Sequence, residues 1–123
     1  MAGYTRTAAG YLRRSASIDP AREQSREAQE ASVRRLAHGD DVTLYIDWGM
    51  SGGKANRPEY QRLRAEVAAD RVSTVYAYSL SRLGRSTVEL LDFVALCETH
   101  GTGVQTEAEG RIGGESAMGR SLP

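Results

Sequence analysis

The stretch Tyr11-Leu12-Arg13-Arg14-Ser15 lies between a short apolar run and a helix-start signal at Asp19-Pro20. The run from Ala8 to Arg13 is a candidate strand and Ser15 to Ile18 a candidate loop. A hydroxyl and two guanidinium groups are therefore expected where a strand ends. In open α/β sheets, sites collect at the carboxyl ends of strands. A serine flanked by arginines at this place favours chemistry on a phosphate. An acyl-transfer triad is not indicated, because no histidine is nearby in the sequence.

Segments typical of strands alternate with segments typical of helices along the chain. Asp19 as N-cap and Pro20 at the first helical position predict a helix to about Ala37. The later predicted strands span 42–47, 72–78 and 103–106, and the later predicted helices span 58–69 and 86–100. This alternation implies a parallel sheet with right-handed crossovers. We expect one α/β domain over residues 1–123, with three layers and a mainly parallel, four- to five-stranded sheet flanked by helices.

Several local features are predicted with these elements. The first helix has a thin apolar side, and the other helices carry apolar residues at helical spacing. Residues 48–56 contain three glycines, which predicts a mobile loop. A tight turn is predicted from Arg82 to Arg85. Residues 1–7 and 114–123 are expected to be flexible. The apolar positions are Ala21, Ala28 and Leu36 (beside Ser25 and Ser32), then Tyr60, Leu63 and Val67, then Leu90, Phe93, Val94 and Cys97.

Composition limits the classes of function. Apolar residues make up 40% of 123, which indicates a folded domain, and the formal net charge is zero, which argues against a protein that coats nucleic acid. Of the 16 Lys and Arg residues only Lys54 is a lysine, and arginine is the better bidentate phosphate ligand. Cys97 is the single cysteine, so neither an internal disulfide nor a zinc cluster is expected. No secretory signal or membrane span is visible, and we predict a cytoplasmic location.

Polar groups from separate segments should meet at one edge of the predicted sheet. Ser15, Asp47 and the segment from Ser79 to Arg85 all follow strands, and Arg57 follows a loop that leaves the same edge. Each of these residues alone has an ordinary structural interpretation, as a turn residue, a cap or a solvated charge. Together they predict one cluster of a hydroxyl, a carboxylate and four guanidiniums, those of Arg13, Arg57, Arg82 and Arg85.

Such a cluster suits displacement at a phosphodiester. Negative charge develops on the non-bridging oxygens, and fixed guanidiniums stabilise it. A serine hydroxyl would be the nucleophile and would leave a covalent phosphoserine. His38 and His100 lie just past helix ends and are expected to face solvent, so no histidine base is predicted. Two ways of activating the serine remain open: Asp47 as a base, or a guanidinium that lowers the hydroxyl pKa.

The motifs resemble the catalytic domain of the serine site-specific recombinases, the family of resolvases, invertases and large serine integrases. The resemblance covers about Ala8 to Gly119, with Tyr11-Leu12-Arg13-Arg14-Ser15 similar to the family's Tyr-x-Arg-x-Ser motif. It implies that Ser15 is the nucleophile and that Arg13 binds the scissile phosphate. Further matching positions, in chain order, are Gln24, Asp47, Ser51-Gly52, Arg57 and Ser81-Arg82-Leu83-Gly84-Arg85, whose two arginines would hold the phosphate.

The resemblance implies cutting and rejoining of double-stranded DNA at recombination sites, as in phages and mobile elements. Each subunit would form a 5′-phosphoserine link and leave a 3′-hydroxyl, with no metal, cofactor or ATP. Dimers would bind each site and tetramers would carry out exchange. Ser81 stands where small resolvases carry aspartate, which favours the integrase branch. Because the family continues into a long dimerisation helix, residues 1–123 alone are not expected to recombine DNA.

Two alternatives stay open at this point. The chain could be a catalytically inactive remnant of the same fold, acting as a regulatory or oligomerisation module. It could also be a flavodoxin-like nucleotide-binding domain. The second alternative is weakened because no strand is followed by GxGxxG or by a Walker-type Gly-Lys-Ser/Thr.

Overall fold

A computed structural model describes residues 6–15, 25–50 and 57–112, with the side chains of Ser15 and Met50 excepted. In this part of the chain a five-stranded sheet has the order β2-β1-β3-β4-β5. The strands are β1 (Thr7–Ser15), β2 (Val42–Met50), β3 (Val72–Ala77), β4 (Gly103–Thr106) and β5 (Gly110–Ile112). The helices are α1 (Arg26–Ala37), α2 (Pro58–Ala68), α3 (Leu80–Leu83) and α4 (Thr87–Thr99).

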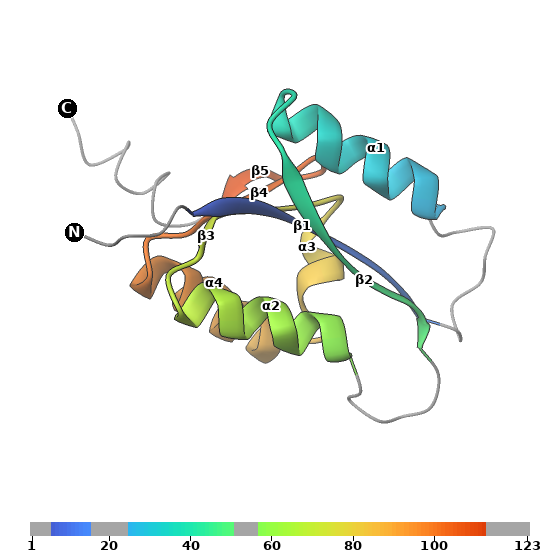
Figure 1. The fold of residues 1–123 in the computed structure, drawn as a ribbon. Coiled ribbons are helices and arrows are strands. Elements are labelled where there is room, and N and C mark those ends of the chain that lie inside the picture. The colour runs from blue at the N-terminus through green and yellow to red at the C-terminus, as the bar shows by residue number, and fades with distance from the viewer. Residues whose placement is uncertain (1–5, 16–24, 51–56, 113–123) are drawn as a thin grey trace.

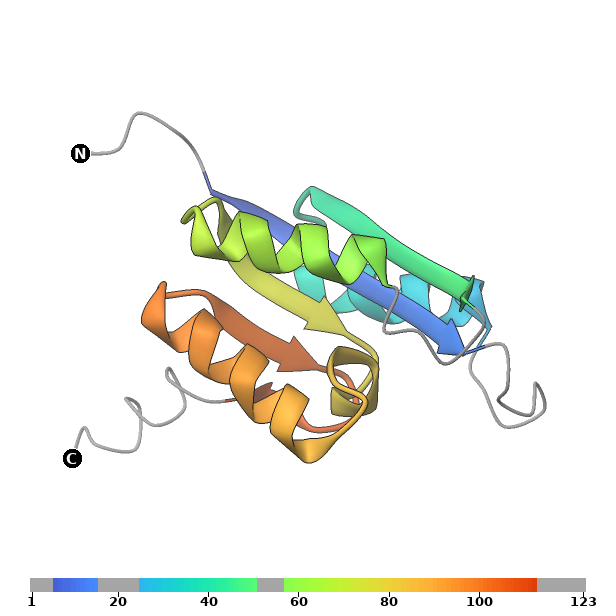
Figure 2. The same cartoon turned by 90° about the horizontal axis from the view of Figure 1, so that it is seen from below.

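The elements form three layers. Helix α1 covers one face of the sheet, and α2 and α4 cover the other (Figure 1). The view in Figure 2 shows α2 and α4 side by side over that second face. The predicted α/β architecture, with helices on both faces of a mainly parallel sheet, is therefore confirmed.

The sheet has a change of direction between β1 and β3. Strand β1 pairs in parallel with β2 on one side and with β3 on the other, and β4 continues in parallel beside β3. The chain thus moves outward from β1 in both directions, and the carboxyl edge between β1 and β3 is the switch point at which open α/β sheets bind ligands. The pairing of β1 with β3 ends at Tyr11 opposite Ala77, so the last residues of β1 pair with β2 alone.

The core between the sheet and α2/α4 contains a row of three aromatic rings. Tyr11, Tyr60 and Phe93 are buried, and each neighbouring pair of ring centroids is 5.4 Å apart. On the opposite face α1 packs closely against the sheet at Gly10. A Cβ added to Gly10 would lie 2.5 Å from Cγ1 of Val33, so a larger residue would not fit there without a shift. The predicted apolar positions of α2 and α4 face this core, with Tyr60, Leu63, Val67, Phe93 and Cys97 buried and Leu90 and Val94 partly buried.

The first helix differs from the prediction in its start and in its buried face. Helix α1 begins at Arg26, because Ser25 has extended backbone angles and its hydroxyl accepts a 3.0 Å hydrogen bond from the N–H of Ala28. A continuous helix from Asp19 was therefore wrong, although the predicted end at Ala37 is confirmed. Ala28 is exposed, whereas the buried positions are Gln29, Ser32, Val33 and Ala37. The shorter helix is rotated relative to the predicted apolar side because a buried glutamine contacts β1.

Both strands at the predicted site are longer than expected. Strand β1 runs to Ser15 and β2 to Met50, so Trp48 and Gly49 belong to the sheet and not to the predicted loop. The two extensions pair with each other, which keeps their backbone groups hydrogen-bonded. The predicted Ser15 loop was thus wrong at its first residue.

The amino-terminal segment is also more ordered than predicted. Thr7 is part of β1, and the guanidinium of Arg6 donates hydrogen bonds of 2.8 Å to the carbonyl of His100 and 3.1 Å to that of Gly101. These contacts at the end of α4 explain why residues 6 and 7 are not frayed. Strand β5 was not predicted as a separate element; it pairs antiparallel with β4 at the edge of the sheet.

Candidate active site

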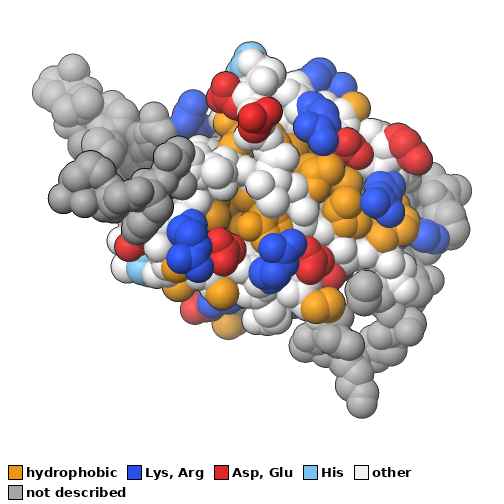
Figure 3. All heavy atoms as spheres, viewed as in Figure 1, with side chains coloured by type: hydrophobic (Ala, Val, Ile, Leu, Met, Phe, Trp, Pro, Cys, Tyr) orange, Lys and Arg blue, Asp and Glu red, His pale blue; other side chains and the backbone are white. Residues whose placement is uncertain are grey.

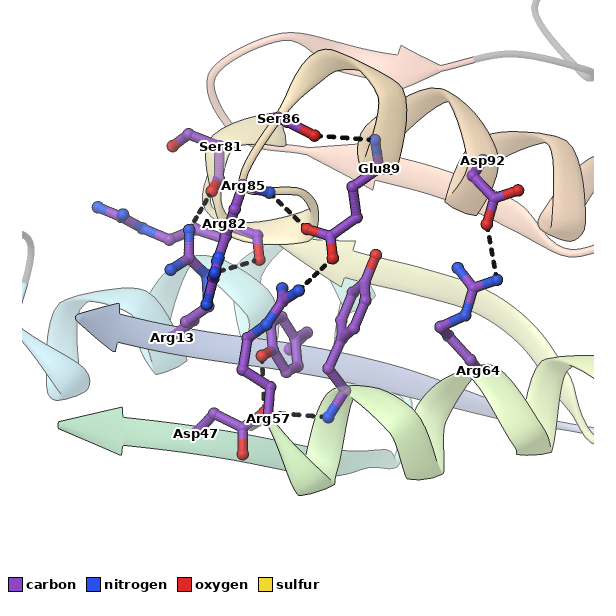
Figure 4. A network of polar contacts seen from close by, with 12 residues as sticks. Arg13, Asp47, Arg57, Arg64, Ser81, Arg82, Arg85, Ser86, Glu89 and Asp92 are labelled. Carbon is purple, nitrogen blue, oxygen red and sulfur yellow. Dashed lines mark hydrogen bonds and ion pairs between the residues drawn. The ribbon is translucent and has the colours of Figure 1, made fainter. Parts of the chain in front are cut away.

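Arg13 connects the end of β1 to helix α3. Its guanidinium donates a 2.6 Å hydrogen bond to the carbonyl of Ser81 and a 3.3 Å bond to that of Arg82 (Figure 4). Burial lowers the pKa of Arg13, and repulsion from Arg57, Arg82 and Arg85 acts in the same direction. Figure 4 shows the four predicted arginines on neighbouring segments at this edge of the sheet.

The segment that carries Arg82 and Arg85 is one helical turn followed by an extended residue. Helix α3 ends at Leu83, and Gly84 has φ −157° and ψ 141°. The predicted tight turn over Arg82 to Arg85 is therefore replaced by the end of α3 and an extended segment, and Arg82 is buried whereas Arg85 is exposed. A Cβ on Gly84 would lie 2.7 Å from the backbone of Leu90, so close packing against α4 sets the course of this segment.

Asp47 is buried in β2 and caps helix α2. Its carboxylate accepts hydrogen bonds from the N–H groups of Glu59 (3.1 Å) and Tyr60 (3.0 Å) and from the hydroxyl of Tyr11 (2.7 Å). The N-cap residue of α2 is Arg57, whose side chain makes no cap hydrogen bond, so Asp47 satisfies the helix end from a neighbouring strand. Negative charge is also favourable at this positive end of the helix dipole.

Tyr11, predicted at the site, lies beneath it with its ring in the core. Burial, followed by the hydrogen bond to Asp47, raises the pKa of the Tyr11 hydroxyl far above its usual value. The hydroxyl therefore stays protonated and donates to the carboxylate. This arrangement links the middle strand of the site to the start of α2.

Arg57 is almost wholly enclosed, with 3% of its surface exposed. Its guanidinium lies 4.4 Å from the ring centroid of Tyr60 and forms an ion pair with Glu89 (Figure 4). Two of its nitrogens, Nε and Nη1, are buried and have no hydrogen-bond partner within the described residues. A buried guanidinium with unused donors is suited to receive an anion.

Glu89 and Gln29 are polar residues of the site that were not predicted as functional. Ser86-Thr87-Val88-Glu89 has the spacing of a capping box, and the hydroxyl of Ser86 accepts a 3.1 Å hydrogen bond from the N–H of Glu89. Gln29 is fully buried; its amide accepts from the N–H of Arg13 (3.3 Å) and donates to the carbonyl of Arg13 (3.2 Å). It thus replaces the strand partner that β1 lacks beyond Tyr11. The sequence signal for this contact was a polar residue, Gln29, on the side of α1 that is buried in the structure.

Three predicted positions lie outside what the structure describes. Gln24 and Ser51-Gly52 fall outside the described ranges, and so does the side chain of Ser15. Ser15 is the last residue of β1 and lies two positions after Arg13. The pairing register between β1 and β2 shifts between Arg14 and Ser15. Ser81, which stands where small resolvases have aspartate, is exposed, and its hydroxyl lies 2.8 Å from that of Ser79.

Charges elsewhere on the visible surface are mixed. Figure 3 shows arginines and carboxylates interspersed over α2, where Arg62 pairs with Glu59 and Arg71 with Glu66. Within residues 6–15, 25–50 and 57–112, no group of three or more His, Cys, Asp or Glu could hold a metal ion. Across the same residues, no helix is both long enough and apolar enough to span a membrane.

The fold and the arginine cluster define an α/β domain with cations gathered at the carboxyl edge of its sheet. The chain belongs to the family described as Resolvase, N terminal domain, whose model matches residues 8–122, and it is a serine recombinase catalytic domain. DNA is the substrate class of this family. This assignment replaces the nucleotide-binding alternative.

Solved structures support the assignment. The N-terminal catalytic domain of TP901-1 integrase is 30% identical, with a TM-score of 0.73 over 95% of this chain and 88% of that one. A resolvase family site-specific recombinase from Streptococcus pneumoniae shares the fold, with 22% identity and a TM-score of 0.69 over 94% and 83% of the two chains. A serine recombinase from Sulfolobus solfataricus also shares the fold, with 21% identity and a TM-score of 0.65 over 96% of this chain and 78% of that one. Comparison with curated protein sequences gives no match.

Proposed function

We propose that this domain cuts and rejoins DNA through a covalent bond between Ser15 and a 5′-phosphate. The observation that supports the proposal is the gathering of Arg13, Arg57, Arg82 and Arg85 at the edge of the sheet where β1 ends at Ser15. In the forward step the Ser15 oxygen bonds to phosphorus, the bond from phosphorus to the 3′-oxygen breaks, and that oxygen takes up a proton. Rejoining is the reverse step, so no ATP is needed.

The arginines are assigned to the developing phosphate charge. Fixed guanidiniums stabilise negative oxygens in the transition state more than in the ground state. Of the two ways to activate Ser15, the guanidinium cluster is the better supported, because both oxygens of Asp47 already accept hydrogen bonds from Tyr11 and the start of α2. We assign Asp47 and Tyr11 to positioning the site. Gln29 is assigned to holding the Arg13 backbone.

The wider setting follows from the integrase-like features. We infer that the domain works in a homodimer at each DNA site and in a tetramer during exchange, on phage or mobile-element DNA in the cytoplasm. The 30% identity to an integrase domain and the serine at position 81 favour the integrase branch.

A trapping experiment tests the proposal without a known target sequence. The DNA is a pool of duplexes with a randomised core that contains 3′-bridging phosphorothiolate links; the thiol released by cleavage rejoins poorly, so the adduct accumulates. Because residues 1–123 alone are not expected to recombine DNA, they are joined for this test to the long dimerisation helix and DNA-binding segment of a large serine integrase. The wild-type fusion should form a denaturation-resistant adduct that peptide mapping places on Ser15, and the Ser15→Ala fusion should form none. An adduct on another residue, an equal yield with Ser15→Ala, or no adduct across the pool would contradict it; the last result favours the inactive-remnant interpretation.

A further inference from the structure

The carboxylate of Glu89 connects two arginine-bearing segments that are distant in sequence. Its Oε2 accepts from Nη2 of Arg57, at the start of α2, and its Oε1 accepts a 2.6 Å hydrogen bond from the backbone N–H of Arg85. Its own N–H is held by the Ser86 hydroxyl. Figure 4 shows Glu89 between Arg57 below and the segment with Arg85 above. One side chain thus fixes the spacing of two cations that belong to different elements.

Arg57 has few other contacts that could fix it. Within the described residues its Nε and Nη1 have no hydrogen-bond partner, and the remaining contact is the face of Tyr60. Stacking holds a guanidinium at a fixed distance from the ring but leaves it free to rotate parallel to the ring plane. Among the described residues, the ion pair with Glu89 is therefore the contact that sets the direction of Nε and Nη1.

Ordinary helix capping does not account for this arrangement. In a capping box the acidic side chain at the third helical position reaches back to the N–H of the N-cap residue. The N-cap of α4 is Ser86, yet Glu89 accepts instead from Arg85 and from Arg57. Burial raises the pKa of the Glu89 carboxyl, but hydrogen bonds from Arg85 and Arg57 outweigh it and leave the pKa lowered. Glu89 is therefore charged at neutral pH.

We propose that Glu89 is a positioning residue that holds the Arg57 guanidinium and the Arg85 segment at the spacing required by the scissile phosphate. It acts through these two arginines and does not itself touch DNA. The inference rests on the proposed function, because it assigns Arg57 and Arg85 to the phosphate. Its geometric part concerns the free protein and can be measured without DNA.

The opposite interpretation makes an opposite prediction. If Glu89 were simply a negative charge near the phosphate site, its neutralisation would tighten DNA binding and speed cleavage, because a repulsive charge is removed. If Glu89 positions the arginines, neutralisation slows cleavage although the net charge becomes more favourable. Glu89→Asp separates the two further, because it keeps the charge but is one methylene too short to reach both partners.

The first measurement is the rate of adduct formation with the phosphorothiolate duplex pool, over a range of DNA concentrations. Glu89→Gln and Glu89→Asp should each lower the rate at saturating DNA about 10- to 100-fold, the scale expected for small misplacement of catalytic groups. The half-saturating DNA concentration should change less than about threefold, since most phosphate contacts remain. Glu98→Gln, exposed at the far end of α4, is the matched control and should react as wild type. A faster reaction for Glu89→Gln, or a wild-type rate for Glu89→Asp, would overturn the proposal.

The second measurement uses the free protein and nitrogen-15 NMR. Rotation of the Arg57 guanidinium should be slow in wild type and fast in both Glu89 variants. Amide exchange at Arg85 should be about tenfold faster in Glu89→Asp, as the loss of one hydrogen bond to a charged group predicts. If wild type forms no adduct but these signals change, the proposed function fails while the positioning geometry stands. Unchanged Arg57 and Arg85 signals would overturn the positioning role whatever the DNA result.

Discussion

The hydroxyl of Tyr11 donates a 2.7 Å hydrogen bond to the carboxylate of Asp47, and both side chains are fully buried. This bond joins neighbouring strands beneath the arginine cluster, and Asp47 passes the connection on to the start of α2, where Arg57 lies. The floor of the site is thus a chain of hydrogen bonds between a strand residue, a buried charge and a helix end.

Removal of the Tyr11 hydroxyl should destabilise the fold. Tyr11→Phe leaves a buried carboxylate short of one donor, and we expect the free energy of unfolding to fall by about 1–3 kcal/mol. Urea denaturation monitored by circular dichroism measures the change. Tyr45→Phe, in the adjacent strand β2, is the control, because the Tyr45 ring packs under Arg62. Equal stability of the two variants would show that the Tyr11–Asp47 bond contributes little.

Replacement of Gln29 by leucine should cost more than its change in volume suggests. Gln29→Leu leaves the N–H and carbonyl of Arg13 without their side-chain partner at a strand end that β3 does not reach. Two unpaired, partly buried groups predict a loss of about 1–3 kcal/mol. Gln61→Leu, exposed on α2, is the control in the same urea titration. Indistinguishable midpoints would contradict the role given to Gln29.

A methyl group at position 84 should displace the segment that carries Arg85. A Cβ there would lie 2.7 Å from the backbone of Leu90, so Gly84→Ala should cost about 1–3 kcal/mol through overpacking. Gly103→Ala is the matched control, because the nearest atom to its added Cβ is 3.6 Å away. Thermal unfolding compares them. If both substitutions were equally mild, close packing would not fix this segment.

Arg85→Lys should separate catalysis from stability. Arg85 is exposed, so the free energy of unfolding should stay within about 0.5 kcal/mol of wild type. Adduct formation with the phosphorothiolate pool should nevertheless fall at least about tenfold, because lysine keeps the charge but loses the planar fork. Arg26→Lys, at the exposed start of α1, is the control. Wild-type cleavage by Arg85→Lys would remove Arg85 from the phosphate site.

The contribution of Glu89 to stability should disappear in acid. Its pKa is lower in the folded protein than the unfolded value of about 4.3, so the folded state favours the charged form above that pH. As pH falls through the folded pKa, the carboxyl becomes protonated and this stabilisation is lost. Wild type should therefore be more stable than Glu89→Gln at pH 7, and the difference should shrink as the pH falls below about 4.3. A difference independent of pH in urea titrations would argue against a charged Glu89.

The sequence by itself determined the order of the elements and the buried sides of α2 and α4. These features follow from short-range periodicity, since an apolar residue at every third or fourth position has to face a core wherever the helix packs. The sequence also placed Arg13, Asp47, Arg57 and the 79–85 segment at one edge, because the carboxyl ends of parallel strands meet there. Some of its errors were at boundaries, since Ser25 starts α1 in place of Asp19 and both site strands run on past the predicted ends. Others concerned the buried face of α1 and the unpredicted strand β5.

Only the tertiary structure decided what the polar side chains contact. Nothing in the local pattern distinguishes an Asp47 that faces a serine from one that caps α2, or a capping Glu89 from one that holds Arg57. The contact between Asp47 and Tyr60 spans 13 positions of the sequence, and the contact between Arg57 and Glu89 spans 32. They depend on which backbone donors remain unpaired once the strands and helices have packed. Hydrophobic periodicity is encoded locally, whereas the partner of a buried polar group is fixed by the assembled fold, and so the roles within the arginine cluster could not be predicted from the sequence.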